Sequence, residues 1–228
     1  MENPSQKPQD LNEWAYTHLK GKILNNEYTP GTQIKIEEIS AQLNVSRTPI
    51  REALLRLKQD GLVEAIPRVG FYVTSVSKQD LKEVFEVRRI IECYAASRCV
   101  TLLTDDQIKD LFWHNNQCRL MISQGKLQEF NAHEVQLHDL IIGSLKNAQI
   151  NRIRKSIEDL IYRQRVYSLQ SQENLHCSVQ EHDSIIKAIA KRDARNAEAA
   201  MNVHICNVEE RLTQHLFDEI SASISDRY

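Results

Sequence analysis

Four side chains in the C-terminal part of the sequence have the types and spacing to hold a metal ion. Glu134 and His138 are four residues apart, so a helix would place them on one face. His182 and His204 each stand beside apolar residues in later amphipathic segments, from which both can project inward to the same depth. Three imidazoles and one carboxylate form an N₃O ligand set that suits Zn²⁺, Ni²⁺ or a similar divalent transition metal and leaves positions for a small ligand.

The plain alternative is that these histidines are hydrogen-bonded core residues that hold no metal. A metal-dependent hydrolase built on His138, His182 and His204 is a further alternative, although no second acid with an obvious general-base role accompanies them. Four other histidines have no partner at helical spacing, and we expect them at the surface: His114, His133, His176 and His215.

A second group of polar side chains has the chemistry to bind nucleic acid. Arg47 and Arg51 are four residues apart and share a helix face, with Thr48 beside them. Residues 46–58 contain four cations and one acid, whereas the N-terminal third as a whole holds nine of each sign. A helix that begins at Ser46 would offer backbone N–H groups to phosphates, and arginine there can hydrogen-bond guanine in the major groove. The alternative is an ordinary solvated basic face.

The composition limits the class of protein. The 228 residues are 41% hydrophobic and 26% charged with a net charge of −2, which is typical of a soluble globular protein. No apolar run approaches the roughly 20 residues of a membrane span, and the start lacks an apolar signal segment. The five cysteines include no C-x-x-C pair, so we expect buried thiols in a cytoplasmic protein. The small net charge does not exclude DNA, because a binding surface needs only a local excess.

The elements that must position the basic group are short. Apolar spacing predicts three helices in the N-terminal third, over residues 11–26, 36–43 and 46–60. Asn44 is suited to the turn before the third helix, and Ser46 to its N-cap. Two β-like runs follow, at 62–66 and 71–76, around a Pro/Gly turn that carries Arg68. Three helices and a hairpin describe a winged helix-turn-helix, with another small α+β unit as the alternative. The tip of the hairpin would place Arg68 where it can enter a minor groove of DNA.

The rest of the chain reads as helix after helix. Its only glycines are Gly125 and Gly143, and the connections between amphipathic segments are short, which favours an antiparallel bundle. The expected helices span residues 78–101, 104–122, 126–146, 149–170, 174–192 and 194–220. The sequence therefore predicts a mainly α protein of two domains, a winged helix-turn-helix over 1–77 and an all-α antiparallel bundle over 78–228.

The N-terminal residues carry a family resemblance. The segment from Ser46 to Leu54 reads S-R-T-P-I-R-E-A-L, preceded by E-I-S-A-Q-L-N-V and followed by D-G-L-V and Gly70. It resembles the GntR family of bacterial transcription regulators, of which S-R-T-P-x-R-E-A-L is a hallmark, and the resemblance covers residues 11–77. It implies DNA contacts by three groups of residues: the helix start at Ser46, the major-groove readers Arg47, Thr48 and Arg51, and the wing tip with Arg68 and Gly70. Some family members carry another DNA-contacting arginine where this chain has Glu37.

The C-terminal residues resemble the ligand-binding domain of the FadR subfamily. Residues 86–92 match its opening E-x-R-x-x-x-E, and Glu134-x-x-Leu137-His138 is similar to its D-x-x-F-H stretch. Residues 181–204 match its closing E-H…A-I…D…A…M…H pattern. The resemblance implies that the metal ligands are Glu134, His138, His182 and His204, with glutamate in place of the usual aspartate. Since the fatty-acyl-responsive founding member lacks these histidines, the resemblance implies a small organic acid as effector.

The sequence thus predicts a DNA-binding transcription regulator whose helical domain senses a small carboxylate. One chain supplies one recognition helix, so we expect a homodimer on an inverted-repeat operator. The candidate effector-binding residues are Arg88, Tyr162 and Arg163. For Arg88 the alternative is a salt bridge to Glu92, one turn along the helix. Besides the hydrolase, the remaining alternative is an interaction module whose histidines are inert.

Overall fold

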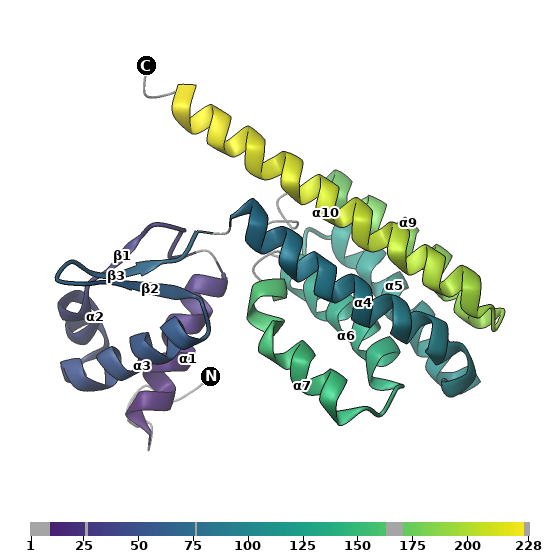
Figure 1. The fold of residues 1–228 in the computed structure, drawn as a ribbon, viewed down its shortest axis with the longest axis horizontal. Coiled ribbons are helices and arrows are strands. Elements are labelled where there is room, and N and C mark those ends of the chain that lie inside the picture. Colours follow the sequence, from purple (N-terminus) through teal and green to yellow (C-terminus); the bar gives the residue numbers. More distant parts are fainter. Residues whose placement is uncertain (1–9, 26, 76, 163–170, 226–228) are drawn as a thin grey trace. The chain divides into compact units, whose positions relative to one another are not determined.

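The computed structural model describes residues 10–25, 27–75, 77–162 and 171–225, with side chains of the last helix described as far as residue 214. The chain divides into two compact units (Figure 1). The N-terminal unit comprises residues 1–76 together with 158–166, and the C-terminal unit comprises the rest. Residues 158–162 therefore group with the N-terminal unit, although the sequence assigns them to the second domain.

Short helices and a small sheet form the N-terminal unit. In chain order its elements are α1 (Leu11–Leu24), β1 (Gln33–Ile34), α2 (Ile36–Leu43), α3 (Arg47–Gln59), β2 (Val63–Ile66) and β3 (Gly70–Val73). The sheet is antiparallel with strand order β1-β3-β2, and β2 and β3 form the predicted hairpin. The strand β1 was not predicted, because two residues are too few to show alternation; it pairs with β3 through Ile34 and Phe71. The winged helix-turn-helix is confirmed, with a three-stranded wing.

Local signals set the ends of these helices. Asp10 caps α1 by accepting hydrogen bonds from the N–H groups of Asn12 and Glu13, at 2.9 and 3.1 Å. Asn44 adopts the predicted left-handed conformation between α2 and α3, with φ of 51°. Ser46 stands at the predicted N-cap position of α3, but its exposed side chain makes no capping hydrogen bond with the described residues.

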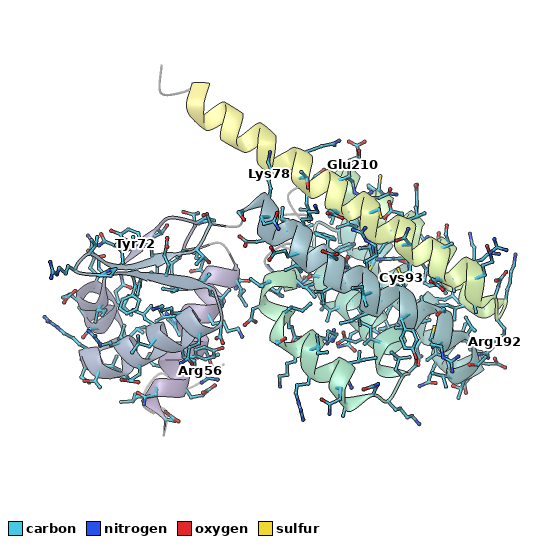
Figure 2. All side chains as sticks on the ribbon, in the orientation of Figure 1. Arg56, Tyr72, Lys78, Cys93, Arg192 and Glu210 are labelled. Carbon is cyan, nitrogen blue, oxygen red and sulfur yellow. The ribbon has the colours of Figure 1, made fainter. Side chains whose placement is uncertain are left out.

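One apolar cluster joins α1 to α3. Leu19 and Ile50 are fully buried in it, and burying such a side chain contributes ~1.5–3 kcal/mol. The Tyr16 hydroxyl donates to Asp60 at 2.7 Å, and the guanidinium of Arg56 lies 3.7 Å from the centre of the Tyr16 ring (Figure 2). These contacts fix which face of α3 is turned away from the core.

The C-terminal unit is built from longer helices. They are α4 (Lys78–Leu102), α5 (Asp105–Ser123), α6 (Leu127–Gly143), α7 (Ala148–Ser156), α9 (Gln172–Ala190) and α10 (Ala194–Ser225). In the core of this unit, α10 packs along α4 and α9, and α5 packs along α6 and α9 (Figure 1). The helical bundle predicted from the sequence is confirmed. No helix in the described ranges is long and apolar enough to cross a membrane.

Polar side chains close the ends of the bundle. Ser77 and Thr104 each form a reciprocal capping box at the start of α4 and α5. Arg192, in the turn between α9 and α10, donates to the carbonyls of Val100 and Leu103 at 2.8 and 2.6 Å (Figure 2). The end of α4 is thereby tied to the turn that brings α10 back along it.

One predicted helix is interrupted. The sequence suggested a continuous helix over 149–170, but α7 ends at Ser156 and Ile157 leaves the helical conformation with φ of −111° and ψ of 4°. Residues 158–162 are helical again. No glycine or proline marks this break. The break coincides with the passage of the chain into the N-terminal unit, in which Asp159 forms a salt bridge of 2.6 Å with Lys20 of α1.

Candidate metal centre and DNA-binding face

Three of the four predicted metal ligands meet inside the helical bundle. His138 comes from α6, His182 from α9 and His204 from α10, and their exposed fractions are 1%, 0% and 0%. One ring nitrogen of each lies within 4.8 Å of one from every other. The ring centres are 4.5–5.4 Å apart. A single ion can therefore reach all three imidazoles.

The histidines occupy positions at which the helical spacing of apolar residues predicts a buried side chain. On α9, the buried stripe runs through Leu175, Val179, His182, Ile185 and Ile189, at steps of three or four residues. A polar ring in an otherwise apolar stripe costs free energy unless a partner compensates it. Such a position therefore indicates a ligand or a strong hydrogen bond.

A buried carboxylate orients His138. Glu92 of α4 lies 2.6 Å from His138 Nδ1 and accepts a hydrogen bond of 2.8 Å from Arg88 Nε. Burial alone would raise the pKa of Glu92, but the charges and hydrogen bonds of Arg88 and His138 outweigh it and hold this pKa well below its usual range. An ionised carboxylate only accepts hydrogen bonds, so His138 Nδ1 is the donor and its lone pair is on Nε2.

A second carboxylate does the same for His204. Glu181 Oε2 lies 2.8 Å from His204 Nδ1, and Glu181 also accepts hydrogen bonds from Asn207 and Arg211. Burial raises the pKa of Glu181, but the bonds from His204 and Arg211 lower it further, to about 2. Burial, together with the charges of His138 and Arg88, lowers the pKa of His204 although Glu181 raises it, which favours the neutral ring.

The outcome is a set of nitrogen lone pairs in a buried centre. The Nε2 atoms of His138 and His204 are buried and have no hydrogen-bond partner among the described residues. A buried polar atom without a partner is costly in a protein interior. A divalent cation removes that cost, and carboxylate–imidazole pairs behind the ligands are typical of metal sites. The residues present thus fit a transition-metal ion.

Sequence reasoning missed the two orienting carboxylates. Glu92 closes the E-x-R-x-x-x-E stretch and Glu181 directly precedes His182, but neither has a spacing that assigns it to a particular histidine. Glu134, the predicted fourth ligand, is partly buried on α6 one turn before His138. Its carboxylate is outside the cluster of donor atoms formed by the described residues.

The predicted effector residues are dispersed. Arg88 is buried, with 4% of its surface exposed, and forms the salt bridge to Glu92 that was the alternative reading. The Tyr162 hydroxyl donates to Asn25 at 3.3 Å within the N-terminal unit, so it does not belong to the unit that holds the histidines. Arg163 lies outside the described residues.

The other histidines differ from the expectation. His114 and His133 were predicted as separate surface residues, but both are partly buried and their Nδ1 atoms lie 3.1 Å apart. The prediction failed because it considered partners on one helix only. His176 is exposed, as expected, and the side chain of His215 lies outside the described residues.

The predicted DNA-binding side chains share one exposed face. Ser46, Arg47, Thr48 and Arg51 are exposed at the start of α3, and Arg68 is exposed between β2 and β3. A groove of about 550 Å³ is lined by Arg51 of α3 and by Arg68. Its lining holds four basic residues, Lys35, Arg51, Lys58 and Arg68, and the acidic Glu37.

Two of the expected charges have partners inside the chain. Arg56, one of the four cations counted near α3, lies on Tyr16 and bonds to Glu13. Arg47 is 71% exposed at its side chain and lies 3.3 Å from Glu37 of α2. Glu37 thus places a negative charge directly beside a residue expected to meet DNA.

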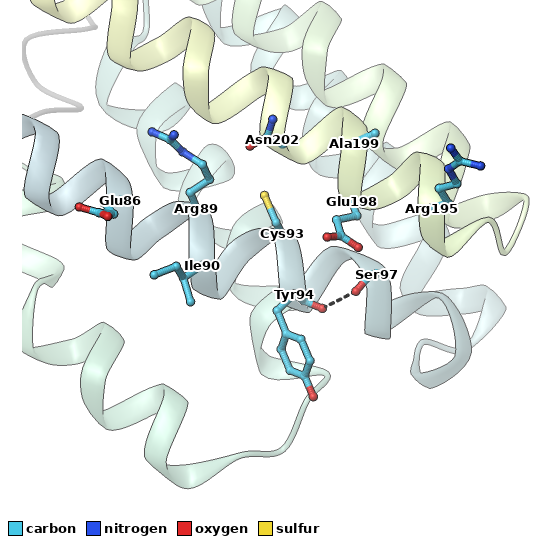
Figure 3. A pocket seen from close by; sticks show the side chains of 10 residues that line it. All are labelled: Glu86, Arg89, Ile90, Cys93, Tyr94, Ser97, Arg195, Glu198, Ala199 and Asn202. Atoms are coloured by element: carbon cyan, nitrogen blue, oxygen red, sulfur yellow. Dashed lines mark hydrogen bonds between the residues drawn. The ribbon is translucent and has the colours of Figure 1, made fainter.

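A further groove, of about 780 Å³, runs between α4 and α10 (Figure 3). Ile90 and Tyr94 project from α4 at its edge, with 68% and 52% of their surfaces exposed. Two acidic and two basic residues line the same groove: Glu86, Arg89, Arg195 and Glu198. Large exposed apolar side chains with a charged rim are typical of a protein interface.

Comparison with known proteins agrees with this architecture. A family model described as bacterial regulatory proteins, gntR family, matches residues 11–73, and a model of the FCD domain matches residues 83–207. The HTH-type transcriptional repressor RspR of Escherichia coli K12 is 29% identical over 215 residues, which are 93% of this chain and 92% of that protein.

Solved structures share the fold. A transcriptional regulator GntR from Rhodococcus sp. RHA1 superimposes with a TM-score of 0.76 at 17% identity, covering 89% of this chain and 97% of the other. The metal-free FCD domain of TM0439 superimposes with a TM-score of 0.52 at 20% identity, covering 63% of this chain and 99% of that domain. The chain therefore belongs to the GntR family of bacterial transcription regulators, and its C-terminal unit is an FCD domain.

Proposed function

We propose that this regulator binds an inverted-repeat DNA operator as a homodimer, and that its FCD domain holds a divalent transition metal and a small carboxylate effector that changes operator affinity. The observation that carries the proposal is the centre formed by His138, His182 and His204, with Glu92 and Glu181 behind two of its rings. Because the partner is chromosomal DNA, we place the protein in the cytoplasm.

The donor set favours Zn²⁺ or Ni²⁺. Imidazole nitrogen suits both ions, and three rings leave coordination positions open. A cation bound by neutral rings keeps its positive charge, so an anionic oxygen is the natural additional ligand. Glu134 can supply that oxygen if its side chain turns, and in our proposal an effector carboxylate takes an open position beside it.

Arg88 supports this centre from behind. It bonds to Glu92, and its charge also acts on His204. In our proposal the guanidinium keeps Glu92 ionised and can exchange this carboxylate for one on the effector, since arginine binds either in the same geometry. Tyr162 and Arg163 remain candidates from the sequence alone.

The hydrolase alternative is weaker. RspR, which aligns with nearly the whole chain, is named a transcriptional repressor. Both carboxylates that contact the histidines accept hydrogen bonds from these rings. A general base needs a carboxylate that can take a proton from water near neutral pH, and a pKa of about 2 makes Glu181 a poor base.

The proposed regulation is tested by titrating operator binding with a panel of small mono- and dicarboxylates. The operator is first selected from random DNA with the purified protein, and fluorescence anisotropy then reports its affinity in metal-loaded and metal-stripped protein. An effector with a coupling of ~1–3 kcal/mol changes operator affinity about 5–150-fold. We expect this change only in the metal-loaded protein. An equal change in both forms would remove the metal from the mechanism, and a panel without any binder would contradict the proposed effector class.

We further propose that the groove between α4 and α10 is covered by a second copy of this chain. Acidic and basic residues both line the groove beside Ile90 and Tyr94, so a two-fold copy of the same surface can place opposite charges against each other. This self-complementary arrangement favours a homodimer over an unrelated partner.

A charge in this surface should separate the subunits. Ile90→Asp buries an unpaired carboxylate in the proposed interface, and we expect sedimentation velocity to show monomers at concentrations where the unmodified protein is dimeric. Leu120→Asp is the matched control, because Leu120 of α5 is similarly exposed at 44% and does not line the groove. A dimer that survives Ile90→Asp but not Leu120→Asp would place the interface elsewhere.

A further inference from the structure

A second pair of imidazoles lies apart from the three-histidine cluster. His114 of α5 and His133 of α6 approach each other with their Nδ1 atoms 3.1 Å apart. Without a metal, this contact is a hydrogen bond in which one Nδ1 carries the proton and the other accepts it. Two rings from adjacent helices are thus held with their Nδ1 atoms facing each other.

The separation matches that of two ligands on one ion. With metal–nitrogen bonds of ~2.0–2.1 Å, ligand atoms at adjacent positions of a tetrahedral or octahedral ion lie roughly 2.9–3.4 Å apart. The 3.1 Å between the two Nδ1 atoms falls inside that interval, so an ion can bind with little movement of either helix.

Binding requires a change of tautomer and a rotation of both rings, because two hydrogen-bonded Nδ1 atoms point at each other and not at a shared ion. The ring that carries its proton on Nδ1 exchanges it with water for one on Nε2, after which both Nδ1 lone pairs face the ion and no net proton is released.

The surroundings suit a partly open site. The Trp113 ring contacts both imidazoles edge to face, with centre distances of 4.8 Å to His114 and 5.2 Å to His133. Asp110, one turn earlier on α5, is exposed, and its charge acts on His114. A carboxylate on this side adds attraction for a cation, and water can fill the remaining positions.

We propose that His114 and His133 form a second transition-metal site that joins α5 to α6 and prefers Cu²⁺ over Ni²⁺ and Zn²⁺. Two imidazoles form a weaker chelate than three, so this site fills after the buried cluster. The stated preference follows the general order of affinity of nitrogen ligands for divalent ions.

Trp113 provides the readout. The chain contains two tryptophans, Trp14 and Trp113, so Trp14→Phe leaves Trp113 as the single fluorophore. In this variant, Cu²⁺ bound to the proposed site lies next to the indole, and we expect it to quench the emission. We expect His114→Gln and His133→Gln each to weaken this quenching about tenfold or more, since loss of a supporting contact alone costs 10–100-fold in metal affinity.

Two controls separate this site from other copper sites. His176→Gln removes an exposed histidine of α9 and should leave the titration unchanged. His138→Ala with His182→Ala removes two ligands of the buried cluster and should leave the quenching of Trp113 in place. Unchanged quenching in His114→Gln and His133→Gln, or its loss in the cluster variant, would overturn the assignment.

Electron paramagnetic resonance gives a measurement that needs no substitution at His114 or His133. In the cluster variant, the bound Cu²⁺ should show hyperfine coupling to two nitrogen nuclei, one from each imidazole. A spectrum with coupling to no nitrogen would also overturn the proposal.

Discussion

Removal of the proposed metal ion is expected to lower the melting temperature of the FCD domain by roughly 5–10 °C. An ion that binds only the folded state, present at about 100 times its dissociation constant, stabilises that state by ~2.7 kcal/mol, and each kcal/mol corresponds to about 2–4 °C for a protein of this size. The Nε2 atoms of His138 and His204 lose their partner when the ion leaves, so the effect is concentrated in the bundle. Calorimetry before and after chelation measures it.

The variant that tests this assignment is His138→Ala combined with His182→Ala. Alanine leaves cavities that lower stability by themselves, so the quantity to compare is the shift produced by added Zn²⁺ or Ni²⁺. We expect a shift in the unmodified protein and in a His176→Ala control, and none in the double variant. Protein that contains no metal by elemental analysis and does not respond to either ion would show that the histidines are structural.

Replacement of Arg47 and Arg51 by alanine is expected to abolish preference for the operator. Each arginine that hydrogen-bonds a guanine contributes ~1–3 kcal/mol of discrimination, which is about 5–150-fold in affinity. Both side chains are exposed on α3, and Arg51 also lines the groove that leads to the wing. Anisotropy titrations with operator and with scrambled DNA measure the loss of specificity.

Comparison among cations makes this test specific. Lys109→Ala removes an equally exposed positive charge from α5 in the other unit and should leave operator affinity within about twofold, since an isolated surface charge contributes little. Sequence preference that persists in the double arginine variant would contradict the assignment of α3 as the reading helix.

The sequence was most informative where a polar residue occupies a position that the helical repeat assigns to the core. His182 interrupts a stripe of apolar residues, and this pattern located it in the core before any fold was known. His204 follows the same logic on α10, where it is fully buried. The start of α3 was predictable for a related reason, because its arginines lie opposite the apolar face.

What the sequence concealed depends on contacts between distant segments. Glu92 and His138 are 46 residues apart, and the distance between His114 and His133 is 19 residues, so no helical spacing connects either pair. The break at Ile157 was likewise not predictable, since the local sequence contains no glycine or proline to end the helix. Such features follow from packing, which a single helix pattern does not specify.

The return of residues 158–162 to the N-terminal unit affects how the protein is made. The apolar core cluster of that unit, as far as the described residues form it, ends at Val73, whereas Asp159, which bonds to Lys20, is added 86 residues later. Bacterial ribosomes add ~5–20 residues per second. The N-terminal DNA-binding unit can therefore fold on the ribosome several seconds before the salt bridge between Lys20 and Asp159 can form. A nascent chain can therefore hold a folded DNA-binding surface while its sensor is still unfinished.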